Sequence, residues 1–374
     1  MKNLTFTVIN DITYDQRMHR ICNTLANAGY HVLLIGRKLS SSHPLVIQSY
    51  KQKRLPCFFK KGKLMYVEYN LRLLFYLLYI SSDCYCAIDL DTILPNYFAS
   101  VIKRKKRVYD AHELFTEQKE IVTRRSIHKF WLQVEKFAVP RFINGYTVND
   151  FIATEFKRRY GVNYAVVRNL PNRSHYQPHP DKKSPFIIYQ GAVNEGRSFE
   201  TLIPAMKKVN ASLKIYGHGN FFDEVANLII KYKVEDKVEL KGLVVPEELR
   251  KITPTAFAAV MLFEDKGLNQ YHSLANRFFD YIMAGVPQVC VSYPEYKAIN
   301  DKYRVACLID NTNAETISSA LNNLLVNDVY YNTLQQNCLK AREELNWQSE
   351  EKIIIAFYKK IFNNGRLPPG DKLK

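Results

Sequence analysis

The chain lacks the long apolar runs and leader segments that mark membrane-spanning or exported proteins. No stretch of about 18 or more uncharged apolar residues occurs, which is the length that a membrane-crossing helix needs. The nearest candidate, LRLLFYLLYI at 71–80, is short and carries Arg72, which favours a buried or surface-seeking helix. The N-terminal MKNLTFTVIN starts directly with a strand pattern, without the charged and apolar regions of a signal peptide. We therefore expect a cytoplasmic protein.

The cysteines form no recognisable framework. Seven cysteines, an odd number at scattered positions, argue against a disulfide scaffold and for a reducing compartment. Cys84 and Cys86 lie two residues apart in a predicted strand, and we expect them to point to opposite faces, where they do not easily chelate one metal. The chain also lacks short tandem repeats and low-complexity segments.

Acidic residues are scarce in the first half of the chain. Residues 1–175 contain 28 lysines and arginines against 13 aspartates and glutamates, so they hold +15 of the net charge of +17. Such a concentration of positive charge suits nucleic acid, anionic lipid headgroups or a lipid-linked phosphate acceptor. Any single run of basic residues is also compatible with a solvated surface. The aromatic, amphipathic segment 58–78 leaves two interpretations open, a membrane-docking helix or a core helix. The basic runs are KQKR (51–54), KKGK (60–63), KRKKR (103–107) and KRR (157–159).

Strand and helix patterns alternate along the whole chain, which is typical of an α/β protein with mostly parallel sheets. The length of 374 residues, 47% of them hydrophobic, is sufficient for two cores, and the polar, proline-rich segment 169–185 is the best linker candidate. We predict two Rossmann-like, doubly wound domains, residues 1–172 and 180–348, followed by an amphipathic helix at about 349–362. The predicted strands are 4–10, 31–36, 84–90 and 106–111, then 185–191, 213–219, 237–242, 258–263, 287–292 and 306–310.

Two glycine-containing turns follow predicted strands of the second domain. GHGNFF (217–222) lacks the third glycine of a dinucleotide fingerprint and follows the second strand of its half, which disfavours nicotinamide chemistry. Gly217 and Gly219 still allow a nucleotide of another kind to approach the backbone, with a plain tight turn as the alternative. The segment 189–197 ends a strand at Gly191 and places Arg197 beside a helix N-terminus, which suits a phosphate clamp.

The stretch YHSLANRFFDYIMAGVP (271–287) combines a packing face with a polar end. Ser273 is the expected N-cap, and Gly285 with Pro287 ends the helix. We expect a polar trio on the opposite side near the N-terminus, where backbone N–H groups favour an anion; a solvated face is the alternative. The apolar positions are Ala275, Phe278, Phe279, Ile282 and Met283, and the polar trio is Asn276, Arg277 and Asp280.

These segments, taken in order, resemble the C-terminal domain of retaining GT-B glycosyltransferases, in particular the group 1 transferases of glycosyltransferase family four. The resemblance includes KGLVVPEEL (241–249) and the helix just described, which stands in place of the family's E-x7-E helix. In the first half it includes NDITYDQRMHR, CAIDLDT and YDAHELF, and 345–362 resembles the closing helix. The resemblance implies two Rossmann-like domains facing a cleft and a hexosyltransferase-type enzyme. Such enzymes use a nucleoside diphosphate sugar, retain the anomeric configuration and require no metal or other cofactor.

The resemblance also implies roles for individual residues. Arg197 contacts the diphosphate, and Arg277 takes the cationic place that a lysine has in one branch of the family. Asp280 falls where a glutamate of the family binds the ribose hydroxyls. His272 stands where the family has a sugar-contacting glutamate, so the identity of the sugar stays open. The implied donor-binding residues are Gly191, Arg197, Gly217, Gly219, Leu243, His272, Ser273, Leu274, Asn276, Arg277 and Asp280.

The first half is implied to supply the rest of the active site. His112 and Glu113 follow a predicted strand, and the family's matching histidine lies near the anomeric centre. The DLD sequence at 89–91 is similar to the metal-binding signature of another glycosyltransferase fold, but its place in this half favours an acceptor-side or loop-capping role, with no metal. The acceptor-side residues are expected to be Asp11, Asp15, Arg17 and Asp91.

The expected activity is transfer to a lipid-linked or cell-surface polysaccharide intermediate, by an enzyme peripheral to the inner face of the cell membrane. One alternative is a nucleotide-sugar 2-epimerase of the same fold, which takes no acceptor and needs no basic first domain. Another is a nucleic-acid binder, which the charge alone suggests. The run KRKKR (103–107) contains no aromatic residue and no known binding motif accompanies it, so we expect no nucleic-acid partner.

Overall fold

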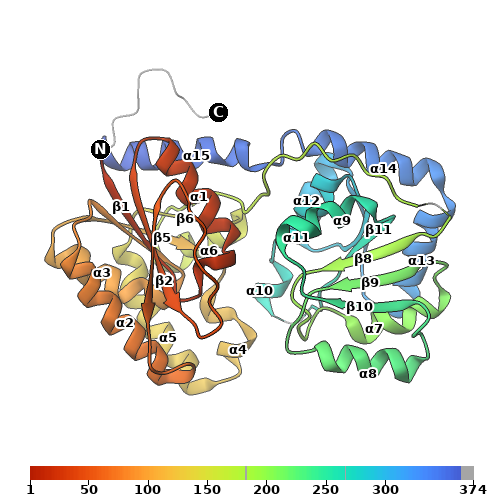
Figure 1. Ribbon diagram of the computed structural model, residues 1–374, viewed down its shortest axis with the longest axis horizontal. Coiled ribbons are helices and arrows are strands. Elements are labelled where there is room, and N and C mark those ends of the chain that lie inside the picture. Colours follow the sequence, from red (N-terminus) through yellow and green to blue (C-terminus); the bar gives the residue numbers. More distant parts are fainter. Residues whose placement is uncertain (182, 266, 364–374) are drawn as a thin grey trace. The chain divides into compact units, whose positions relative to one another are not determined.

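The computed structural model describes residues 1–181, 183–265 and 267–363, which form two compact units (Figure 1). The first unit combines Met1–Asn169 with the segment that begins at Glu350. The second unit is Leu170–Ser349. The chain therefore leaves the first unit once, and its last described helix belongs largely to that unit.

The first unit is built on one parallel sheet in the order β3-β2-β1-β4-β5-β6-β7. This is the Rossmann order 3-2-1-4-5-6 extended by one strand. Because the winding direction reverses between β1 and β4, the loops after these strands are the expected place for a site. The strands are β1 (Asn3–Thr7), β2 (His31–Lys38), β3 (Lys51–Pro56), β4 (Cys84–Ile88), β5 (Lys106–Ala111), β6 (Gly145–Thr147) and β7 (Ala165–Val166).

Helices cover both faces of this sheet. The helix α15 (Trp347–Phe362) packs beside the strands through Tyr358, whose ring lies 6.0 Å from that of Phe6. The crossovers from β3 to β4 and from β4 to β5 run in the direction opposite to that from β1 to β2. With right-handed connections, their helices therefore lie on the face opposite to α1. The other helices are α1 (Gln16–Asn27), α2 (Gly62–Tyr79), α3 (Ile93–Ile102), α4 (Lys119–Val122), α5 (Arg125–Ala138) and α6 (Asp150–Tyr160).

The second unit repeats the same winding on a six-stranded parallel sheet, in the order β10-β9-β8-β11-β12-β13. Its direction reverses between β8 and β11. The strands are β8 (Phe186–Gln190), β9 (Ser212–Tyr216), β10 (Val238–Gly242), β11 (Ala258–Met261), β12 (Gln288–Val291) and β13 (Ala306–Ile309). The helices are α7 (Phe199–Ala205), α8 (Phe222–Tyr232), α9 (Pro246–Ile252), α10 (Leu268–Tyr271), α11 (Asn276–Ala284), α12 (Pro294–Tyr303), α13 (Ala314–Val326) and α14 (Asp328–Ala341).

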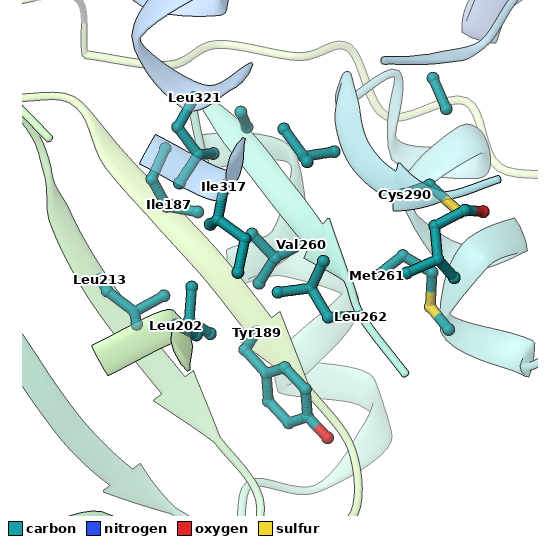
Figure 2. Close-up of a cluster of buried hydrophobic side chains, with 14 of the residues drawn as sticks. Ile187, Tyr189, Leu202, Leu213, Val260, Met261, Leu262, Cys290, Ile317 and Leu321 are labelled. Carbon is teal, nitrogen blue, oxygen red and sulfur yellow. The ribbon is translucent and has the colours of Figure 1, made fainter. Parts of the chain in front are cut away.

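The core of the second unit lies against the central strands of its sheet (Figure 2). Ile187 on β8 and Val260 on β11 are fully buried, as are Leu202 and Ile317 from the helices that cover them. Strands that are buried on both faces appear in the sequence as continuous apolar runs. This describes the predicted strands β8, β11 and β12, in which every residue is buried.

The sequence missed three strands of the first unit, although every predicted strand is present. KQKR, interpreted as a basic run, is the start of β3. This strand lies at the edge of the sheet, where lysines protect unpaired backbone groups from association with other chains. β6 has three residues and β7 has two, which is too short to show an alternating pattern.

Two local predictions are wrong. The Sγ atoms of Cys84 and Cys86 lie 3.9 Å apart on the same face of β4, because alternate residues of a strand share a face. Ser273 does not cap the following helix. α11 begins at Asn276, and its N-cap is Ala275, which makes no side-chain capping bond.

Candidate active site

The loop after β8 approaches the turn after β9 without space for side chains. Gly217 has φ +146°, and a Cβ atom there would lie 1.8 Å from the carbonyl oxygen of Gly191. A Cβ on Gly219 would lie 2.2 Å from Oδ1 of Asn194. These glycines therefore let two loops of the protein pack closely at the carboxyl ends of the strands.

A pocket of about 360 Å³ opens at this edge of the second unit. It lies where the sheet reverses its winding direction, at the end of β8 and the start of α11. The structure thus brings together the predicted Gly191, Asn276, Arg277 and Asp280. Its lining residues are Gln190, Gly191, Ala192, Leu249, Ala275, Asn276, Arg277 and Asp280.

Arg277 is buried, with 8% of its surface exposed, which rules out the solvated face that the sequence left open as the alternative. Its guanidinium lies over the rings of Tyr189 and Phe263, at 4.8 and 4.9 Å, and its Nε approaches Sδ of Met261 at 3.2 Å. The buried Nη2 atom has no hydrogen-bond partner among the described residues. A buried cationic donor with spare hydrogen-bonding capacity at a pocket wall is suited to bind an anion.

Arg197 adds a second positive charge near the same aromatic ring. Its guanidinium carbon lies 4.1 Å from the centroid of the Phe263 ring, which is one of the two rings that Arg277 contacts. The aromatic faces hold both side chains without neutralising them. Two arginine side chains thus lie against one ring at this edge of the second unit, a placement that fits the predicted phosphate contact.

Asp280 is positioned by a buried glutamine that the sequence analysis missed. Nε2 of Gln190 donates to Oδ2 of Asp280 at 3.2 Å, and Oε1 of Gln190 accepts a bond of 2.8 Å from the hydroxyl of Thr253. Gln190 is 4% exposed, and its backbone N–H donates to the hydroxyl of Tyr281. Its position as the last residue of the strand before the winding reversal is the signal that identifies it.

The residues just before α11 are held by aromatic side chains. The backbone N–H of Ala275 donates to the hydroxyl of Tyr296 at 3.0 Å, and Oγ of Ser273 lies 3.4 Å from the same hydroxyl. The ring of His272 packs edge-on against Tyr271 at 5.0 Å. Ser273, His272 and the partly buried Leu274 thus form the approach to the pocket without lining it. Leu243 also stays outside the pocket lining and is exposed in the loop after β10.

The edge of the first sheet carries a different cluster, centred on His112. Its Nδ1 lies 3.4 Å from Oδ2 of Asp89, and its Nε2 lies 3.2 Å from Oδ2 of Asp110. The backbone N–H of His112 donates to Oδ1 of Asp89 at 2.9 Å. Burial lowers the pKa of His112, but Asp89 and Asp110 outweigh burial and raise this pKa to about 9. At neutral pH the ring is therefore an imidazolium that forms ion pairs with both aspartates.

Arg17 supports this cluster from the first turn of α1. Its Nη2 donates to Oδ1 of Asp110 at 2.9 Å, its Nη1 donates to the carbonyl of Val167 at 3.0 Å, and its Nε lies 3.1 Å from Nε2 of His112. A protonated Nε2 has no lone pair to accept this N–H, so the last approach is a contact between two cations around a shared carboxylate. Burial raises the pKa of Asp110, but Arg17 and His112 reverse the effect and keep this pKa low.

Asp91 lies at the same edge of the sheet, and its carboxyl group has a pKa near neutral pH. Burial, followed by repulsion from Asp89, raises the pKa of Asp91 to about 7, against a hydrogen bond from Tyr66. Burial likewise raises the pKa of Asp89 to about 6, although His112 opposes the shift. Oδ1 of Asp91 is buried without a hydrogen-bond partner among the described residues. This edge of the first sheet thus presents acidic groups and a protonated histidine.

The other predicted residues of the first unit hold the local fold. Asp11 caps a short 3-10 turn through the N–H of Thr13 at 2.8 Å and pairs with Arg54 at 3.2 Å. Asp15 caps α1 through the N–H of Met18 at 3.1 Å. Glu113 accepts a hydrogen bond from Gln118. These contacts shape the loop after β1 and the turn after β5.

The described residues offer neither a cluster of metal-binding side chains nor a membrane-spanning helix. In residues 1–181, 183–265 and 267–363, no group of three or more histidine, cysteine or acidic side chains is arranged to hold a metal ion. The helices in these ranges are also too short or too polar to cross a lipid bilayer.

Solved structures of similar fold define the class. A sucrose-phosphate synthase from Thermosynechococcus elongatus superposes with a TM-score of 0.79 at 16% identity, covering 97% of this chain and 100% of that one. HepE from Anabaena, in complex with UDP and glucose, gives 0.75 at 10% identity over 96% and 100%. WaaG, a glycosyltransferase involved in lipopolysaccharide biosynthesis, gives 0.73 at 13% identity over 94% and 98%. The two Rossmann-like units therefore have the GT-B architecture.

The family comparison covers the second unit. Residues 172–343 match the model of the family "Glycosyl transferases group 1". Comparison with curated protein sequences found no match. The family match and the GT-B fold together support a glycosyltransferase of the group 1 type.

Proposed function

We propose that the protein transfers a hexose from a nucleoside diphosphate sugar to a glycan or lipid-linked acceptor with retention of anomeric configuration. The observation that best supports the donor is the buried Nη2 of Arg277, which lacks a hydrogen-bond partner among the described residues and belongs to a side chain that lines a pocket. HepE, of similar fold, has UDP in its structure. A diphosphate in this pocket supplies the acceptor oxygens that Arg277 needs.

The same geometry supports a role for the arginines in bond cleavage. Negative charge develops on the diphosphate as the glycosidic bond to the sugar breaks. Fixed cationic donors stabilise that charge without reorganising. Arg197 and Arg277 are both held against Phe263, so their charges are in place before substrate binds. We propose that these charges fulfil the role of a metal ion at the leaving group and that no metal is required.

Asp280 is the proposed ligand of the ribose hydroxyls. Its carboxylate lines the pocket beside Arg277 and is oriented by Gln190, which supports a contact with a group adjacent to the phosphates. A carboxylate accepts from both hydroxyls of a ribose, so this position favours ribonucleotides over deoxyribonucleotides. The roles of His112 near the anomeric carbon and of Asp91 toward the acceptor stay predictions from the family resemblance.

The acceptor and the location are proposed from charge. The first 175 residues hold almost all of the excess positive charge, which supports a phosphate-bearing acceptor at an anionic membrane. WaaG, of similar fold, is involved in lipopolysaccharide biosynthesis, and this supports a cell-envelope polysaccharide or its lipid-linked intermediate as the product. We accordingly propose a cytoplasmic protein, peripheral to the inner face of the cell membrane.

A thermal-shift screen with nucleoside diphosphates and their sugars tests the donor. A ligand present at 100 times its dissociation constant stabilises the folded state by about 2.7 kcal/mol, so the right nucleotide gives a clear upward shift. No shift with any nucleotide contradicts the proposal. Incubation with the stabilising sugar nucleotide alone separates transfer from epimerisation, because rapid epimer formation without an acceptor identifies a 2-epimerase.

A further inference from the structure

The helix α2 (Gly62–Tyr79) is apolar on two opposite faces. Four residues at intervals of four, Met65, Tyr69, Leu73 and Leu77, are fully or almost fully buried. They pack into the core formed with the sheet of the first unit, where Tyr69 also donates to the carbonyl of Val8. This face alone accounts for the attachment of α2 to the sheet.

The second apolar face of α2 points away from the core. Its five residues are each more than half exposed, and they recur at spacings of three and four, so they form one stripe along the helix. On a helix with 3.6 residues per turn this stripe lies nearly opposite the buried one. The five residues of the outer stripe are Leu64, Val67, Leu71, Phe75 and Tyr79.

The apolar surface extends beyond α2 at both of its ends. The neighbouring helix α3 packs beside α2 on the same face of the sheet (Figure 1). Its exposed apolar residues are Phe98, Val101 and Ile102. Nζ of Lys103 donates to the carbonyl of Ile80, which places the C-terminal end of α3 at the C-terminal end of α2. Phe58, almost completely exposed, precedes the N-terminus of α2.

Positive charges lie at both ends of this stripe. Lys60, Lys61 and Lys63 are exposed at the N-terminal end of α2. Arg104 and Lys105 are exposed just after α3, and therefore at the C-terminal end of the stripe. An exposed apolar band with aromatic residues and lysines at its ends matches a bilayer, where acyl chains meet a layer of phosphate headgroups.

We infer that the outer stripe of α2 and the exposed residues of α3, together the α2–α3 face, dock on an anionic lipid bilayer. The helix lies in the plane of the headgroup boundary, since its other face stays in the protein core. A second copy of this chain is a poorer occupant, because a twofold interface places the same patch of each subunit against the other and brings these lysines close together. The inference extends the proposed function by locating the acceptor, but it involves no residue of the donor pocket.

Vesicle flotation with the full-length protein tests this surface. The wild type is expected to float with vesicles that contain phosphatidylglycerol and to bind pure phosphatidylcholine vesicles at least about tenfold more weakly. The double variant Leu71→Glu/Phe75→Glu is expected to lose at least about tenfold in affinity for the anionic vesicles. Lys61→Glu/Lys63→Glu is expected to weaken binding less and to reduce its dependence on salt.

The control variant Ile230→Glu/Val329→Glu introduces the same two negative charges at exposed aliphatic residues of the second unit. It is expected to bind vesicles as the wild type does. Circular dichroism and the nucleotide-dependent thermal shift are expected to be unchanged in every variant, so failure of the donor proposal is visible separately. Wild-type affinity of the Leu71→Glu/Phe75→Glu variant for anionic vesicles overturns the inference. A wild-type dimer that this variant converts to a monomer, without vesicle binding by either protein, identifies a second copy as the occupant and also overturns it.

Discussion

The two units have the same sheet order but opposite chemistry at the edge where that order reverses. After β8 the second unit places two arginines against Phe263, beside a pocket. At the ends of β4 and β5 the first unit pairs Asp89 and Asp110 with an imidazolium and places Asp91 near Asp89. A repeated topology thus determines where side chains converge, whereas the residues at the strand ends determine what they bind.

The two edges also differ in how their charges are neutralised. In the first unit the buried Arg17 pairs with the fully buried Asp110 at 2.9 Å. In the second unit Arg277 has an Nη2 atom without a hydrogen-bond partner among the described residues. Paired buried charges stabilise a fold only as a pair, whereas a buried donor in need of an acceptor is available to a ligand. The predictions below follow from this contrast.

The largest effect is expected from breaking the pair in the first unit. Arg17→Met leaves the fully buried Asp110 with His112 as its remaining cationic partner, so the free energy of unfolding is expected to fall by up to about 3–5 kcal/mol. Urea unfolding followed by circular dichroism measures the change. The double variant Arg17→Met/Asp110→Leu is expected to recover most of it. Lys297→Met, which breaks the exposed Lys297–Asp301 pair of the second unit, is expected to cost less than about 1 kcal/mol.

Replacing Arg277 of the second unit with methionine is expected to affect ligand binding and catalysis. Arg277→Met removes the donor that we propose to bind the leaving diphosphate, so turnover is expected to fall about 10²–10³-fold. The nucleotide-dependent thermal shift is expected to shrink with it, and Arg277→Lys is expected to keep part of both because it restores the charge. Full activity of Arg277→Met contradicts a phosphate role for this side chain.

His112 gives the first unit a distinctive dependence on pH. Because its pKa is about 9 in the folded state and about 6.5 in an unfolded chain, its contribution to stability is complete below pH 6.5 and is lost as the pH rises through 9. His112→Gln is expected to flatten the decline in unfolding free energy between these values. An unchanged slope in the variant means that the ring is not held as an imidazolium. The raised pKa values of Asp89 and Asp91 act in the same direction at lower pH, below about 7.

The smallest effect is expected at Gln190, where a substitution changes one hydrogen bond to Asp280. Gln190→Ala removes one hydrogen bond to Asp280, so affinity for the nucleoside diphosphate is expected to fall about tenfold, corresponding to about 1–1.5 kcal/mol. The preference for ribose over 2′-deoxyribose is expected to fall with it. Thr253→Val, which removes only the hydroxyl behind Gln190, is expected to have a weaker effect in the same direction. Equal ribose preference in wild type and Gln190→Ala contradicts the proposed role.

The sequence predicted the fold better than the contacts of the site. Strands such as Ile187–Tyr189 are apolar runs that need no knowledge of distant residues. For Arg277, by contrast, the sequence left an anion site and a solvated face both open, and the rings that bury it come from β8 and from the loop after β11. Only tertiary packing brings those rings together. Segment 58–78 was ambiguous for a related reason, since α2 is apolar on both faces and its periodicity does not distinguish core from surface.

The central claim is that the second unit alone supplies the diphosphate site. Calorimetric titration of the nucleoside diphosphate that gives the largest thermal shift tests it with three proteins: wild type, Arg277→Met and His112→Gln. We predict at least about 100-fold weaker binding by Arg277→Met, equivalent to about 2.7 kcal/mol, and wild-type affinity for His112→Gln. Wild-type affinity of Arg277→Met, or an equal loss in both variants, would contradict the assignment.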